Sequence, residues 1–238
     1  MTDALATVGL HLAVLVVGAA AYVFVARKTV RFGWFAAALA VYVVYDAFLT
    51  RFYRYVPNVI GEDWNWTGKL MAIALVLAIA STPFFGLRNV GLTFHQRPGS
   101  WLAWLVLAVF LALIFYAAYA TGDGVPSDME TIAFQWTMPG FDEELFYRGV
   151  MLLALNEAFV ARANVVGAPI GFGGLLTSIL FGVIHTLAWS DGGVEFDPAI
   201  FAMTGGPSLI LLWLRERTGS ILTPIIAHNV ANGAFNLF

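Results

Sequence analysis

Residues 101–120 read WLAWLVLAVFLALIFYAAYA, a run of twenty residues without a charged or amide side chain. A helix of roughly 20 mostly apolar residues is long enough to cross the hydrocarbon core of a membrane. Three further segments have a similar apolar character, at 5–26, 32–50 and 69–87. The first part of the chain therefore predicts four membrane-spanning helices.

The composition points to the same class of protein. The 238 residues are 60% hydrophobic and 11% charged, whereas soluble domains carry about 25% charged residues. Twelve basic against fifteen acidic residues give a net charge of −3, which leaves no basic surface for a nucleic acid. The absence of cysteine excludes disulfides, thiolate metal sites and a cysteine nucleophile. These counts favour a polytopic membrane protein over a cytosolic enzyme or a disordered chain.

The second half of the chain is also apolar, but polar residues interrupt it. Four further helices are predicted near 131–160, 171–189, 199–214 and 219–237. We expect Pro139-Gly140 to bend or restart the first of these, and Gly205-Gly206-Pro207 to break or kink the third. Residues 190–198 are predicted to be a polar loop, either an ordinary turn or the border of an entrance. The predicted fold is all-α, a polytopic membrane bundle of about eight transmembrane helices.

One stretch of the second half concentrates charge inside a predicted membrane helix. Ionisable residues in such a helix cost roughly 2.5–3.5 kcal/mol each and normally face a cavity or a partner. Glu144 and Arg148 are four residues apart, so they can pair on one helical face. Glu143 lies about 100° around an α-helix from Glu144, which leaves it free to face a cavity as a general acid or base. The alternative is a charge cluster at the membrane interface.

Two more polar pairs lie on separate predicted helices. Phe181 and His185 are four residues apart and share a face, as do His228 and Asn232. His228 and Asn232 could donate hydrogen bonds toward an oxyanion that develops during acyl transfer. The alternative is that His185 is a hydrogen-bonded core residue and that His228 and Asn232 hold helices together. The sequence shows no clear hydrogen-bond partner for either imidazole.

Together these residues resemble the CPBP family of intramembrane proteases, which includes the CAAX prenyl endopeptidases and the bacteriocin-processing, Abi-type proteins. The family pattern is Glu-Glu-x-x-x-Arg, then Phe-x-x-x-His, then His-x-x-x-Asn or a close variant. This chain matches it in order, and the match covers about residues 135–238. The resemblance implies that residues 131–238 form a four-helix catalytic core inside the bundle. Residues 1–130 then supply four helices without a recognisable motif.

The resemblance also implies a role for each matching residue. Glu143 and His185 would bind and deprotonate the attacking water, and His228 and Asn232 would stabilise the oxyanion. Glu144, Arg148 and Phe181 would support the site. The expected activity is that of an intramembrane glutamic endopeptidase without a cofactor. Zinc is the alternative, because Glu143, His185 and His228 could form a zinc site with two imidazoles, one carboxylate and an open water position.

Other functions stay open at this stage. The same fold could serve as a non-catalytic membrane scaffold or immunity protein, and buried charges also occur in ion-coupled transporters. The chain lacks the repeated halves of many transporters. The expected partners are a membrane protein or peptide substrate and the lipid bilayer, with no nucleic acid. The expected location is the plasma membrane of a prokaryotic cell. The sequence does not indicate an oligomeric state.

Overall fold

The fold is that of a computed structural model, which describes residues 2–57, 60 and 63–238. The chain divides into two compact units. The first comprises Met1–Val44 and Met151–Trp213, and the second comprises Tyr45–Val150 and Leu214–Phe238. Each unit is therefore built from segments that are far apart in the sequence.

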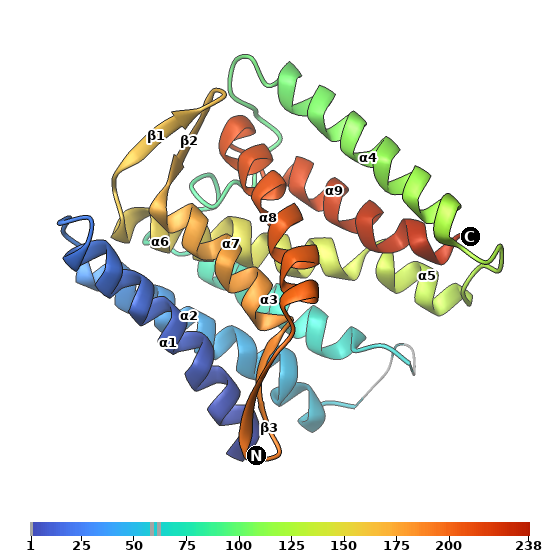
Figure 1. The fold of residues 1–238 in the computed structure, drawn as a ribbon, viewed down its shortest axis with the longest axis horizontal. Coiled ribbons are helices and arrows are strands. Elements are labelled where there is room, and N and C mark those ends of the chain that lie inside the picture. Colours follow the sequence, from blue (N-terminus) through green and yellow to red (C-terminus); the bar gives the residue numbers. More distant parts are fainter. Residues whose placement is uncertain (1, 58–59, 61–62) are drawn as a thin grey trace. The chain divides into compact units, whose positions relative to one another are not determined.

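The first unit combines helices with two β-hairpins. Its elements are α1 (Thr2–Phe24), most of α2 (Phe32–Thr50), α6 (Leu152–Ala158), β1 (Arg162–Val165), β2 (Ala168–Gly171), α7 (Phe172–Ile184), β3 (Leu187–Ser190), β4 (Gly193–Phe196) and most of α8 (Pro198–Thr218). In Figure 1 the blue helix α1 runs beside α7 and β3. The His11 ring connects α1 to β3 and to α2, because its Nε2 lies 2.8 Å from the Leu187 carbonyl oxygen and its Nδ1 lies 2.6 Å from the Tyr42 hydroxyl.

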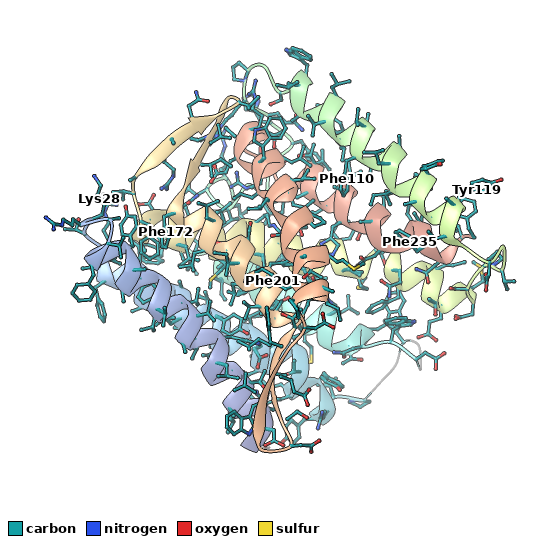
Figure 2. All side chains as sticks on the ribbon, in the orientation of Figure 1. Lys28, Phe110, Tyr119, Phe172, Phe201 and Phe235 are labelled. Carbon is teal, nitrogen blue, oxygen red and sulfur yellow. The ribbon has the colours of Figure 1, made fainter. Side chains whose placement is uncertain are left out.

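Aromatic rings form part of the core of this unit. The ring centroids of Tyr22 and Phe159 are 5.0 Å apart, and those of Phe159 and Phe172 are 5.2 Å apart. Figure 2 labels Phe172 at the start of α7. Because aromatic pairs at this spacing add to the gain from burial, the cluster packs α1, α6 and α7 together.

The second unit consists of helices among the residues described. Its elements are the end of α2, η1 (Phe52–Tyr55), α3 (Trp66–Ala80), α4 (Trp101–Thr121), α5 (Met129–Gln135), almost all of η2 (Gly140–Met151), the end of α8, α9 (Leu222–Gly233) and η3 (Ala234–Asn236). Figure 1 shows the green helix α4 running beside the red helix α9. Near the end of this contact Ala118, Val230 and Ala234 form a buried apolar cluster.

The number of membrane-spanning helices is smaller than predicted. Four described helices are long and apolar enough to cross a membrane, namely α1, α2, α4 and α8. The prediction of eight spans is therefore not supported, although the mostly helical, membrane-type fold is confirmed. The helices α3, α7 and α9 contain 15, 13 and 12 residues. Even the first of these is about 22 Å long at 1.5 Å per residue, which is less than the roughly 30 Å of a hydrocarbon core.

The helical boundaries differ from the prediction at two prolines. The helix expected over 69–87 ends at Ala80, because a residue before a proline, here Thr82 before Pro83, disfavours helical backbone. By contrast, α8 continues through Pro207, so the predicted break at Gly205-Gly206-Pro207 is not found. A membrane helix tolerates the loss of the one backbone hydrogen bond that proline removes. A complete break would leave several backbone groups unpaired, which would cost more free energy.

The segment predicted as one helix over 131–160 is divided into three helices. The helix α5 ends at Gln135, η2 runs over Gly140–Met151, and α6 follows. The restart at Pro139-Gly140 is therefore confirmed. The side chain of Asp128 caps α5 by accepting a hydrogen bond from the Thr131 amide at 2.9 Å. The hydrogen bonds from Thr131 lower the pKa of Asp128 below its ordinary value.

Two antiparallel hairpins correct the purely helical prediction. The strands β1 and β2 are joined by Val166-Gly167, and β3 and β4 by Asp191-Gly192. All four of these turn residues have positive φ angles, between 49° and 81°. Two left-handed residues in a two-residue loop form a type I′ turn, and Asp-Gly is a strong signal for it. The segment 190–198, predicted to be a loop, therefore contains the turn and the second strand of a hairpin.

We expect Val166→Asn to raise the free energy of unfolding by about 1 kcal/mol, because a β-branched residue at a φ of 49° is strained and asparagine tolerates this conformation. Denaturant unfolding of the detergent-solubilised protein measures the change. The matched control is Val165→Asn, in the adjacent strand position, which should give no gain. An equal gain from both variants would contradict the strain.

Candidate functional site

The charged motif lies on η2, a π-helix of 12 residues. A π-helix has hydrogen bonds from residue i to i+5, is rare, and often occurs at functional sites. The prediction assumed α-helical geometry for Glu143, so the wider helix corrects the estimate of 100° between it and Glu144. Asp142 and Glu144 are fully buried, whereas the Glu143 side chain keeps 14% of its surface exposed.

The predicted pair between Glu144 and Arg148 is confirmed. The Arg148 guanidinium donates a hydrogen bond to Glu144 Oε1 at 2.9 Å, and both side chains are buried. The backbone of the same turn is held by a second arginine, since Arg215 Nε donates to the Arg148 carbonyl oxygen at 3.0 Å. A buried charge is tolerated when it is paired in this way.

Helix α9 brings His228 to the same carboxylate. The His228 Nδ1 atom lies 2.7 Å from Glu144 Oε1, so the imidazole has a partner that sequence reasoning missed. An ionised carboxylate only accepts hydrogen bonds, so Nδ1 is the nitrogen that carries the proton. The other ring nitrogen, Nε2, lies 3.8 Å from Glu143 Oε2. The site thus places one imidazole between two carboxylates.

A lysine and a tyrosine complete the network, and sequence reasoning missed both. The Lys69 ammonium lies 2.7 Å from Glu143 Oε1 and 2.9 Å from Asp142 Oδ2. The Tyr45 hydroxyl donates to the same Asp142 oxygen at 2.9 Å. The ring of Tyr45 stacks on Phe146 of η2, with centroids 3.7 Å apart. A lysine at the start of an apolar segment was a signal for Lys69, but nothing in the sequence identified its partner.

The two asparagines of α9 have different surroundings. Asn229 is buried, and its Oδ1 accepts a hydrogen bond from the Gly140 amide at 2.8 Å. Asn232 lies one turn after His228 and is partly exposed. Within the residues described, the Asn232 side chain forms no hydrogen bond. Asn229 therefore anchors the start of η2, and the predicted role of Asn232 toward an oxyanion stays a prediction.

His185 and Phe181 belong to the first unit. His185 directly follows α7, and its Nδ1 lies 2.7 Å from the Phe181 carbonyl oxygen. The two rings are 4.8 Å apart, which confirms that the two residues share a face. The exposed His185 side chain lines a pocket of about 430 Å³ with Glu195 and Phe196 of β4. The joint action of His185 and Glu143 stays a prediction.

The zinc alternative concerns Glu143 and His228 of the second unit and His185 of the first. Over the described ranges, no three His, Asp or Glu side chains are placed to hold a metal ion. The Glu143 carboxylate already contacts the Lys69 ammonium at 2.7 Å, and an ammonium at this distance repels a dication. A zinc site formed by Glu143, His185 and His228 stays a hypothesis, which metal analysis of the purified protein would test.

Gly140 allows η2 and α9 to approach each other closely. A Cβ atom at this position would lie 2.8 Å from the Ile225 carbonyl oxygen and still closer to the Asn229 amide group. We expect Gly140→Ala to lower the free energy of unfolding by about 1–3 kcal/mol, as overpacking does in cores. Thermal unfolding in detergent measures it. Gly206→Ala is the control, because nothing lies within 4 Å of a Cβ there. Equal stability of the two variants would contradict the close approach.

Four apolar helices of membrane-spanning length indicate an integral membrane protein. Its second unit contains a buried cluster of carboxylate, imidazole and ammonium groups. Residues 125–234 match the family model described as type II CAAX prenyl endopeptidase Rce1-like. This match confirms the resemblance of this region to the CPBP family of intramembrane proteases. The matched region contains all the motif residues from Glu143 to Asn232. No curated protein and no solved structure matches the chain.

Proposed function

We propose that the protein is an intramembrane endopeptidase that hydrolyses a peptide bond with a water molecule activated by Glu143. The observation that carries the proposal is the position of the Glu143 carboxylate, which faces His228 Nε2 at 3.8 Å and is the least buried of three consecutive carboxylates on η2. The match of residues 125–234 to the model of a protease family supports the same reaction.

The geometry accommodates an attacking water. Two atoms 3.8 Å apart can both lie within about 2.8 Å of one water oxygen, which is hydrogen-bond distance. In the proposed reaction, Glu143 accepts a proton from this water as its oxygen adds to the scissile carbonyl. The carbon–nitrogen bond then breaks, and the proton passes from Glu143 to the leaving nitrogen. Water is the nucleophile, so no covalent enzyme intermediate forms.

The remaining site residues have supporting roles in this proposal. His185 helps to bind the water, and His228 and Asn232 donate to the developing oxyanion. Since Nδ1 of His228 already donates to Glu144 at 2.7 Å, Nε2 can donate only when both ring nitrogens carry protons. Glu144 and Arg148 hold the imidazole in place. The proposed substrate is a membrane protein or peptide, and the proposed location is the plasma membrane of a prokaryotic cell.

The test compares protein termini in membranes from cells that carry the wild type or Glu143→Gln at equal expression. Termini that depend on Glu143 are expected, and they identify the substrate and its cleavage site. The matched control is Glu157→Gln, which removes an exposed carboxylate paired with Arg31. Identical termini from wild type and Glu143→Gln, with both proteins folded, would favour a scaffold. Proton-coupled uptake in proteoliposomes that is lost with Glu143→Gln would favour a transporter.

A further inference from the structure

The two lysines of the chain are in opposite environments. Lys28 and Lys69 are the only lysines in the sequence. Lys28 is exposed in the segment between α1 and α2, where Figure 2 labels it. Lys69 is in the first turns of α3, and only 11% of its side chain is exposed. Because lysine is costly to bury, the position of Lys69 needs a specific partner.

The partners of Lys69 are two consecutive carboxylates of η2. Its ammonium lies 2.7 Å from Glu143 Oε1 and 2.9 Å from Asp142 Oδ2. Asp142 is held in turn by the Tyr45 hydroxyl at 2.9 Å. The Tyr45 ring is fixed by its stacking on Phe146. The Lys69 ammonium is therefore held by the buried Asp142 carboxylate, which Tyr45 keeps in place. The same ammonium also contacts the Glu143 carboxylate.

This contact sets the orientation of the Glu143 carboxylate toward the imidazole. Because Lys69 binds Oε1, the carboxylate is oriented with Oε2 toward His228 Nε2, 3.8 Å away. The ammonium also offsets the repulsion between the adjacent charges of Asp142 and Glu143, which is strong where water is scarce. One side chain thus provides both the orientation and the counter-charge of the carboxylate.

We propose that Lys69, anchored by Asp142 and Tyr45, is a positioning residue that holds the Glu143 carboxylate ionised and correctly oriented for catalysis. The inference rests on the proposed function, because it assigns a task to Glu143. Lys69 acts through Glu143 and is not itself assigned a contact with the substrate. Misplacement of a catalytic group by about 1 Å can reduce a rate on the order of 100-fold.

The test measures kcat and KM of purified variants on a synthetic peptide that spans the cleavage site identified in membranes. We expect Lys69→Met to lower kcat on the order of 100-fold while KM changes little. Lys69→Arg, which keeps the positive charge, should recover a large part of kcat. Lys28→Met is the matched control and should retain wild-type kinetics and stability.

A second variant separates positioning from stability. Lys69→Met with Asp142→Asn removes one positive and one negative charge, so the buried network keeps its charge balance. We expect this variant to fold like the wild type and still show the low kcat. In a Glu143→Asp background, whose shorter carboxylate cannot hold the same contact, Lys69→Met should lower kcat much less.

The outcomes that overturn the inference differ from those that overturn the function. Wild-type kcat in the charge-balanced variant would show that Lys69 serves only to neutralise charge. An undiminished effect of Lys69→Met in the Glu143→Asp background would show that it does not act through Glu143. If the wild type produces no termini that depend on Glu143, the proposed function fails, and the inference fails with it.

Discussion

Glu143→Gln is expected to lower the rate of peptide cleavage by about 10³-fold or more, while the protein keeps its fold. Glutamine has nearly the same size, and its amide oxygen can still accept a hydrogen bond from Lys69, which lies 2.7 Å from Glu143 Oε1. The amide cannot accept a proton from water, so general-base catalysis is lost, and this alone contributes about 10²–10⁴-fold. Cleavage of the identified peptide by purified protein measures the rate.

The variant Glu157→Gln is the control that shows whether the loss of cleavage is specific to Glu143. Glu157 forms an exposed ion pair with Arg31 at 2.9 Å, and exposed pairs contribute at most about 1 kcal/mol. This variant should therefore cleave at the wild-type rate. Cleavage by Glu143→Gln within tenfold of wild type would show that another group activates the water.

Arg148→Met is expected to lower the free energy of unfolding by about 3–5 kcal/mol, the cost of removing one partner of a buried ion pair. The Arg148 side chain is 1% exposed, and the Glu144 side chain beside it is fully buried. Without the guanidinium, Glu144 would remain in a site of low dielectric constant, and among the residues that the structure describes the imidazole of His228 would be its remaining hydrogen-bond donor. Unfolding of the detergent-solubilised protein measures the loss.

Two further variants check this explanation. Glu144→Gln combined with Arg148→Met should recover part of the stability, because it removes the uncompensated charge. Arg31→Met, at the exposed pair with Glu157, should change the free energy of unfolding by less than about 1 kcal/mol. A loss at Arg31 as large as that at Arg148 would contradict the role of burial.

Local spacing predicted the contacts that lie within one helix. Glu144 and Arg148 are paired at 2.9 Å, and Phe181 contacts His185, as their four-residue spacings indicate. The sequence did not reveal the partners of these groups across the fold. Lys69 and Glu143 are 74 residues apart in the sequence, and only tertiary packing shows which carboxylate the lysine contacts.

Hydropathy predicted the class of fold better than its dimensions. A short helix packed against protein is as apolar as one that faces lipid, so the 13 residues of α7 resembled part of a membrane span. The hairpin turn at Asp191-Gly192 carried a recognisable signal, but most of the strand before it fell in the helix predicted over 171–189, and the strand after it fell in the segment predicted to be a loop. The turn at Val166-Gly167 had no such signal, since valine rarely adopts a positive φ angle.

The residues of the buried polar network, Tyr45, Lys69, Asp142, Glu143, Glu144, Arg148 and His228, are synthesised in a fixed order. Its members lie on α2, α3, η2 and α9, which leave the ribosome in that sequence. Until α9 is made, Glu144 has Arg148 as a partner but lacks His228, the imidazole that completes the arrangement. The proposed active site therefore becomes complete only after α9 has been made.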